Sequence, residues 1–146
     1  MIGKLILNSD KSVTIETENE LITYQFASFG ARLGARLIDT LIIIIPNMII
    51  PIIPAWLYWS LQQSGEDQST VGQNSFGIKT LSLDGSKISF GQATGRFFGD
   101  FLNFLTVYIG YFMFFFNYKR QCLHDFLSGC IVVKEIVRTP KIRLTE

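Results

Sequence analysis

The sequence has few charged residues and very little cysteine or histidine. Charged residues make up 17% of the 146 residues, against about 25% in an average soluble domain. The 13 Lys and Arg nearly balance the 12 Asp and Glu, which excludes a strongly basic nucleic-acid binder. Two cysteines are too few for a small scaffold held together by disulfides.

The motifs of common catalytic sites are also absent. The sequence contains no Walker A pattern, no zinc-finger signature and no G-x-S-x-G nucleophile motif. Cys122, His124, Asp125 and Cys130 do not have the spacing of a common zinc site. We therefore expect no enzyme, no cofactor and no metal, and we expect both cysteines to be reduced thiols.

Charge is missing from two long stretches. Residues 40–65 and 101–118 contain no Asp, Glu, Lys or Arg. Apolar runs of this length are typical of membrane segments, and a chain this small cannot bury both of them completely. We therefore predict a mainly α-helical integral membrane protein with apolar blocks at 40–61 and 97–118, the first helix starting near Ser28.

Prolines leave two arrangements of the first block open. Pro46, Pro51 and Pro54 disfavour one straight helix, because proline removes a backbone hydrogen bond. The block is either one kinked span or a hairpin, and the same choice applies to the second block. In both cases Lys and Arg place the termini in the cytoplasm.

The polar segments predict a small β element. Residues 13–18 alternate apolar and polar side chains, and we expect residues 1–25 to form a water-facing, β-like N-terminal segment. Within the polar loop 62–89, residues 78–83 alternate in the same way before an Asp84-Gly85 turn, and residues 87–90 alternate back. We expect the strands near 78–83 and 130–137 to pair, ahead of a charged tail at 135–146.

A partial repeat precedes each apolar block. The pattern S-F-G-x-x-x-G-x-x-x-x-D-x-L starts at Ser28 and again at Ser89. Small residues spaced by four let another helix approach closely, which suits a homo-oligomer or a subunit of a membrane complex. The candidate packing residues are Gly30, Gly34, Gly91, Gly95 and Gly99.

Ionisable residues stand at the start of each block. Arg32, Arg36 and Asp39 share one helical face, and Arg96 and Asp100 recur before the second block. One interpretation is interfacial arginines with neutralised aspartates, with an Arg36–Asp39 ion pair. The other is an ion or proton site that includes Asp39, Asp100 and Asp125.

His124 is the single histidine, and it also has two interpretations. It is either a proton carrier near neutral pH or a hydrogen-bonding group at a helix end, oriented against Asp125.

These residues resemble the RDD family of small, mostly bacterial membrane proteins, over about residues 24–134. The resemblance rests on the seven-residue spacing of Arg32 and Asp39, on Thr70-Val71-Gly72-Gln73 and on the Arg120–Asp125 segment. Gln73 stands where the family usually has lysine.

The resemblance assigns the family's polar trio to Arg32, Asp39 and Asp125, supported by Arg36, Arg96, Asp100 and His124. It implies a membrane domain at 26–134, in the bacterial cytoplasmic membrane. It also implies either transport of an ion or small solute by an oligomer, cation/proton exchange included, or a non-enzymatic scaffold or assembly subunit of a membrane complex.

Overall fold

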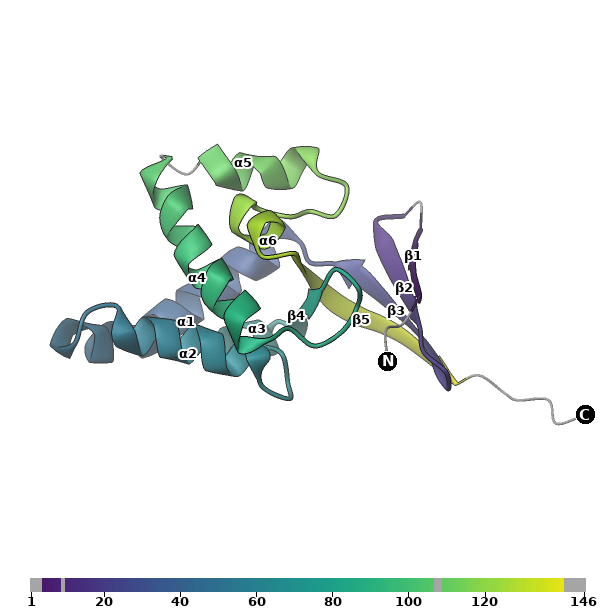
Figure 1. Cartoon of the computed structure of the whole chain (residues 1–146), viewed down its shortest axis with the longest axis horizontal. Coiled ribbons are helices and arrows are strands. Elements are labelled where there is room, and N and C mark those ends of the chain that lie inside the picture. Colours follow the sequence, from purple (N-terminus) through teal and green to yellow (C-terminus); the bar gives the residue numbers. More distant parts are fainter. Residues whose placement is uncertain (1–3, 9, 107–108, 141–146) are drawn as a thin grey trace, which may run out of the picture.

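The computed structural model describes residues 4–8, 10–106 and 109–140, in which one antiparallel sheet adjoins a group of helices (Figure 1). The strands are β1 (Lys4–Leu7), β2 (Ser12–Glu16), β3 (Glu20–Phe26), β4 (Ile78–Ser82) and β5 (Cys130–Pro140). The helices are α1 (Phe29–Ile49), α2 (Ile53–Ser64), α3 (Val71–Ser75), α4 (Phe90–Leu105), α5 (Ile109–Phe116) and α6 (Leu123–Leu127).

The sheet has the order β1-β2-β3-β5-β4, and every neighbouring pair is antiparallel. Alternation along β2 and β3 turns Val13 and Phe26 inward, where they pack with Ile131 and Val133 of β5. This cluster is an ordinary apolar core, and it holds the N-terminal strands against the end of the chain.

The predicted pairing of the strands near 78–83 and 130–137 is confirmed. β4 pairs with β5 from Ile78 opposite Lys134 to Ser82 opposite Cys130. The prediction of a returning strand at 87–90 is wrong, because only the single bridge Leu81–Lys87 forms and α4 begins at Phe90. β5 also extends beyond the predicted start of the charged tail at 135.

The first helix begins where the sequence predicts. Ser28 caps α1 by accepting a hydrogen bond from the backbone N–H of Ala31. Pro46 lies inside α1, and α2 starts at Ile53 after a short turn. The two helices pack side by side (Figure 1), so the first block folds back on itself. Ile52 in the turn has a φ of 72°, a conformation that β-branched residues rarely adopt.

The predicted fold class, a mainly α-helical integral membrane protein, is wrong. Among the described residues, no helix combines the length and the apolar character that crossing a membrane requires. α1 is long enough but carries Arg32, Arg36 and Asp39 in its first half. The rest of the apolar sequence is divided among shorter helices, and a five-stranded sheet makes up much of the fold.

The helices nevertheless expose many apolar side chains. Met48 near the end of α1 is 82% exposed, and Phe116 at the end of α5 is 88% exposed. Other exposed apolar side chains include Leu33, Leu37, Leu41, Ile45, Ile49, Leu61, Phe98, Phe101, Leu105, Phe112 and Phe115. Single surface-exposed apolar residues are common, but so many large ones on neighbouring helices are unusual for a monomer surrounded by water.

Candidate functional site: a buried polar network

Asp125 lies at the centre of a charged cluster and is fully buried. One of its carboxylate oxygens, Oδ1, accepts hydrogen bonds from Arg96 Nη2 at 2.6 Å and from Arg96 Nε at 3.1 Å. The other oxygen, Oδ2, forms an ion pair with Arg32 and accepts a hydrogen bond from the backbone N–H of Cys122. One carboxylate of α6 therefore ties the first turn of α1 to the middle of α4.

Arg96 extends this cluster to the sheet. Its Nη1 donates to Gln63 Oε1 of α2 at 2.8 Å and to Thr80 Oγ1 of β4 at 3.0 Å. The side chain is 7% exposed. A buried guanidinium is stable only when its donors are used in this way.

Asp39 forms a second buried centre, with different partners. Its oxygens accept hydrogen bonds from Tyr58 Oη at 2.8 Å, Thr70 Oγ1 at 2.5 Å and the backbone N–H of Gly72 at 2.8 Å. Thr70 also caps α3 in a capping box with Gln73. Asp39 thus binds the polar loop to α1. Thr70 and Gly72 are two residues apart in the T-x-G pattern, and this spacing lets both donate to the same carboxylate.

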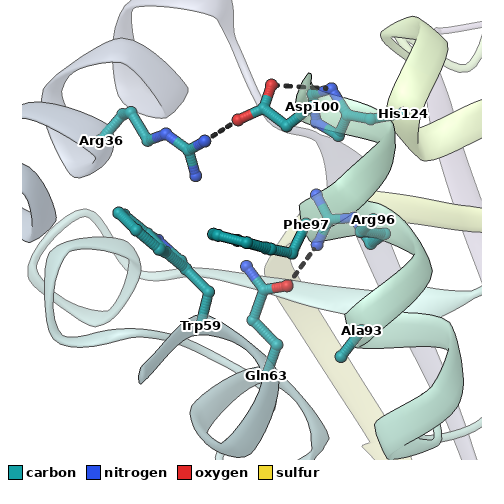
Figure 2. A pocket seen from close by; sticks show the side chains of 8 residues that line it. All are labelled: Arg36, Trp59, Gln63, Ala93, Arg96, Phe97, Asp100 and His124. Atoms are coloured by element: carbon teal, nitrogen blue, oxygen red, sulfur yellow. Dashed lines mark hydrogen bonds and ion pairs between the residues drawn. The ribbon is translucent and has the colours of Figure 1, made fainter. Parts of the chain in front are cut away.

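A third group surrounds Asp100, which lines a small pocket (Figure 2). Asp100 forms an ion pair with Arg36 and accepts a hydrogen bond from Tyr111 Oη at 2.5 Å. The Arg36 guanidinium also lies over the ring of Trp59, 4.4 Å from its centroid, a favourable cation–π geometry.

The histidine connects the first and third groups. His124 Nδ1 lies 3.5 Å from Asp100 Oδ1 of the third group (Figure 2). Its Nε2 lies 3.2 Å from Asp125 Oδ1, and its Nδ1 lies 2.7 Å from Asn103 Nδ2. A neutral imidazole with its proton on Nε2 donates to Asp125 and accepts from Asn103. Burial lowers the pKa of His124, and this effect outweighs the negative charge of Asp125, which by itself would raise it. The lowered pKa favours this neutral form.

The electrostatics keep Asp125 ionised. Burial by itself raises the pKa of Asp125, but His124, Arg96 and Arg32 outweigh it and hold the pKa well below its usual range. Burial and the hydrogen bond to Asp39 raise the pKa of Tyr58 to about 12. Both shifts favour an ionised Asp125 and a protonated Tyr58 near neutral pH.

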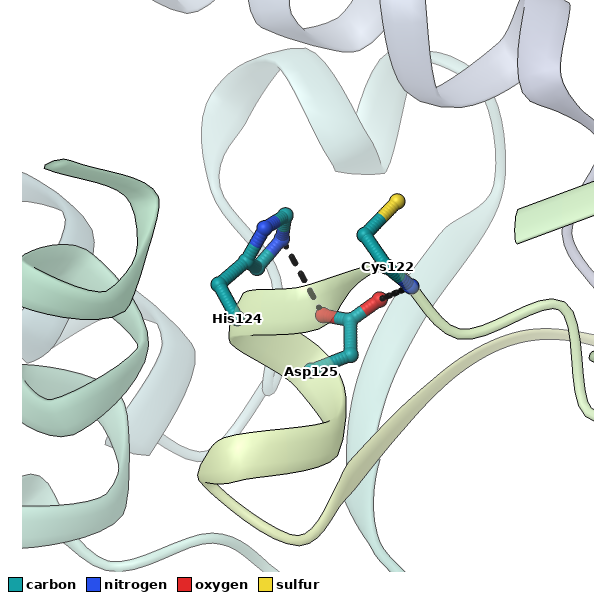
Figure 3. A group of neighbouring side chains, drawn as sticks. All are labelled: Cys122, His124 and Asp125. Atoms are coloured by element: carbon teal, nitrogen blue, oxygen red, sulfur yellow. Dashed lines mark hydrogen bonds and ion pairs between the residues drawn. The ribbon is translucent and has the colours of Figure 1, made fainter. Parts of the chain in front are cut away.

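Cys122, His124 and Asp125 offer ligand atoms within 4.8 Å of one another (Figure 3). However, both Asp125 oxygens are already paired with arginines, and these cations repel a metal ion. Burial and the charge of Asp125 raise the pKa of Cys122 to about 11, whereas metal binding requires a thiolate. The chemistry of this cluster suits an ion-pair network better than a metal centre.

The structure brings most of the expected residues together, with different pairings from some that the sequence favoured. Arg32 pairs with Asp125, whereas Asp39 is held by neutral groups of α2 and α3. Arg36, expected beside Asp39, pairs with Asp100 instead. Tyr58 and Tyr111, which bind aspartates, and Gln63 and Thr80, which bind Arg96, were missed, since no local motif connects them to these partners.

The five glycines have unequal surroundings. A Cβ at Gly34 would meet the ring of Phe76, and one at Gly99 would meet the backbone of His124. Gly30 and Gly95 have no atom within 4 Å of a Cβ position, and Gly91 approaches only Ser89. Contact with another helix through these positions remains a prediction.

An open cavity of about 790 Å³ adjoins the network. Arg32, Arg36 and Arg96 line it, and so do Asp39 and Asp100. Its apolar lining comes mainly from aromatic side chains, which are Phe29, Trp59, Phe97, Phe101, Tyr111, Phe112 and Phe115.

Comparison with known proteins assigns the chain to a family. The model of the RDD family matches residues 48–129. The chain belongs to the RDD family. The matched segment includes Asp125, whereas Arg32 and Asp39 precede it, so their place in the family trio rests on the motif.

A relative in Bacillus subtilis (strain 168), described as "Uncharacterized protein YxaI", is 35% identical over 89 residues. The alignment covers 61% of this chain and 58% of that protein, so the chain spans less than two thirds of the relative's length. No solved structure matches the chain.

Proposed function

We propose that this RDD protein is a non-enzymatic scaffold or assembly subunit that binds to the lipid–water interface through its helices. The observation that carries the proposal is that both carboxylate oxygens of the buried Asp125 are paired with arginines, which hold this carboxylate ionised. A carboxylate in this state cannot carry protons near neutral pH. It suits a structural tie, because removing one partner would leave a buried charge uncompensated.

The exposed apolar side chains of α1, α2, α4 and α5 support membrane binding. A helix that lies in the interface buries its apolar face about 5–10 Å into the boundary between headgroups and acyl chains. Such binding requires no helix that crosses the bilayer. The cytoplasmic face of a bacterial inner membrane is the location that we propose.

Co-flotation with phosphatidylcholine–phosphatidylglycerol vesicles tests this binding. Met48→Glu on α1 should weaken binding at least about tenfold, because it removes about 1.5 kcal/mol or more of apolar burial. The matched control is Val137→Glu on β5, a position that is also exposed, and it should leave binding unchanged. Equal loss in both variants, or a wild-type chain that stays unbound, would contradict the proposal.

Transport of an ion or small solute by an oligomer is the second candidate. The cavity beside Arg36 and Asp100 favours it, since a solute path needs open space with polar groups. Purified protein in sealed vesicles, with an internal pH probe and sodium and potassium gradients, separates the two functions. Flux that Asp39→Asn and Asp125→Asn both abolish without unfolding supports transport, and no flux above empty vesicles supports the scaffold.

An oligomer or a larger membrane complex is the form in which we propose that the protein works. Gly30 and Gly95 leave room for another helix. Disulfide cross-linking of a Gly95→Cys variant in the native membrane should give a discrete adduct. A Gly34→Cys variant, at a position that already faces Phe76, is the matched control and should give little.

A further inference from the structure

The cavity between the helices combines two properties that a structural network does not require. Its lining is mostly apolar and aromatic, yet it contains three arginines against two aspartates. A volume of about 790 Å³ falls within the range of about 300–1,000 Å³ that small-molecule sites occupy. A complementary guest would be apolar along most of its length and negatively charged at one end.

Arg32 indicates where the negative charge would go. Its Nη1 pairs with Asp125, but Nε and Nη2 are buried and have no hydrogen-bond partner among the described residues. These two groups form the side of a guanidinium that binds a carboxylate or phosphate through two parallel hydrogen bonds. Buried donors without acceptors are costly. Arg32 lines the cavity and its side chain is 12% exposed, so a small shift of this side chain would present the two donors to an anionic group.

The pairing of charges leaves room for such a group. Arg32 and Arg96 share the single carboxylate of Asp125, so this part of the network has an excess positive charge. The third arginine, Arg36, is balanced by Asp100. The oxygens of Asp39 already accept three hydrogen bonds from neutral groups.

The apolar part of the lining reaches the surface. Phe101, Phe112 and Phe115 line the cavity and are each more than half exposed. They belong to the same apolar helical surface that we assign to the membrane. A hydrocarbon chain could therefore leave the cavity along aromatic side chains without crossing a polar surface.

We propose that this cavity binds a lipid amphiphile, with its anionic head group at Arg32 and its acyl chain along Phe101, Phe112 and Phe115. The head group is a carboxylate or a phosphate, as in a fatty acid or a lysophospholipid. This assigns the RDD chain a ligand site that scaffolding by itself does not need.

Quenching of Trp59 tests the site directly. Trp59 lines the cavity, and Trp56→Phe removes the other tryptophan of the chain. Brominated oleate, brominated lysophosphatidic acid and a brominated long-chain alcohol are added to the full-length protein below their micelle concentrations. At least one anionic amphiphile should quench Trp59 at a concentration about tenfold lower than the alcohol requires, an affinity difference of about 1.4 kcal/mol.

Two neighbouring phenylalanines provide a matched pair of variants. Phe101 and Phe98 lie on α4 with exposures of 59% and 52%, but only Phe101 lines the cavity. Phe101→Asp should abolish the quenching, and Phe98→Asp should leave it within about twofold. Arg32→Lys retains a cation for Asp125 but lacks the two-donor edge, so it should remove the preference for the anionic amphiphiles over the alcohol.

Several results would overturn the proposal. These are an equal response to the alcohol and both anions, equal loss in Phe98→Asp and Phe101→Asp, or no quenching in protein shown by circular dichroism to be folded. Met48→Glu separates this proposal from membrane binding, because Met48 does not line the cavity. This variant should lose vesicle binding and retain quenching of Trp59.

Discussion

In the sheet, an apolar cluster that includes Val13, Ile131 and Val133 is almost inaccessible, and none of the charged side chains that the structure describes in the strands is buried. In the helical half, Asp39, Asp125 and Arg96 are buried, while Met48 and Phe116 are exposed. The sheet has the usual arrangement of a protein surrounded by water. The helices instead bury charged side chains and expose large apolar ones, and an exposed apolar patch of this kind is a candidate interaction site. The two halves therefore differ in which side chains they bury and which they expose, and this difference underlies the membrane-binding proposal.

The largest effect should come from removing the central carboxylate. Asp125→Ala leaves Arg32 and Arg96 without their shared partner, at a cost of about 3–5 kcal/mol in the free energy of unfolding. Ile131→Val, a loss of one methylene in the sheet core, should cost about 0.5–1.5 kcal/mol. Urea unfolding followed by tryptophan fluorescence measures the free energy of unfolding of both variants. Equal losses in the two variants would contradict the proposed difference between the charged core of the helices and the apolar core of the sheet.

The next largest loss of stability should come from disturbing the close packing of α3 against α1. A Cβ at Gly72 would lie 2.1 Å from the carbonyl oxygen of Ala35, so Gly72→Ala should cost about 1–3 kcal/mol. Gly95→Ala has open space around it and should stabilise α4 by about 0.5–1 kcal/mol. Thermal unfolding measures both, and a neutral Gly72→Ala would show that α3 does not pack as described.

Neutralising Asp39 sharpens the contrast between a structural and a transport role. Asp39→Asn places an amide where oxygens accept from Thr70 and Gly72, so we expect a loss of about 1–3 kcal/mol. The exposed Asp67→Asn should change stability by less than about 0.5 kcal/mol. Denaturant titrations of both variants, run beside the flux assay, show which role the carboxylate has. An Asp39→Asn variant of full stability that loses flux would favour transport.

Acidification should give the smallest effect. The pKa of His124 is lowered by folding from 6.5, so below about pH 6.5 the unfolded chain binds a proton that the folded chain excludes. Stability therefore falls as the pH drops through this range. The lowered pKa of Asp125 adds a further loss below its ordinary value of 3.8. Urea midpoints at mildly acidic and neutral pH should differ less in His124→Gln, and an unchanged difference would contradict the assignment.

Local patterns allowed part of the fold to be predicted from the sequence. Ser28 predicts the start of α1 because a serine cap acts within one helical turn. The alternation of apolar and polar residues predicts the strands that form the β4–β5 pair. The membrane-spanning helices were predicted from the absence of charge, but the helix that reaches into the first block begins eleven residues earlier and includes Arg32, Arg36 and Asp39. Charge-free runs measure composition, not the length of one helix.

The candidate site was only half predictable. The family motif and helical spacing selected Arg32, Asp39 and Asp125, since these residue types are costly beside apolar segments. Their partners could not be deduced. Tyr58 and Thr70 meet Asp39 only because α2 and α3 fold back against α1, and Arg36 prefers Asp100 across the helices to Asp39 one turn away. Such pairings depend on tertiary packing, which no single segment encodes.

The most direct test of the membrane-binding proposal is the accessibility of spin labels on the protein bound to vesicles. Labels at Met48→Cys and Val137→Cys, both on exposed positions, report collisions with oxygen, which concentrates in lipid, and with a nickel complex, which remains in water. Cys122 and Cys130 are buried and are replaced by alanine in the background. The account predicts oxygen-dominated relaxation at position 48 and nickel-dominated relaxation at 137. Nickel-dominated relaxation at both positions would contradict it.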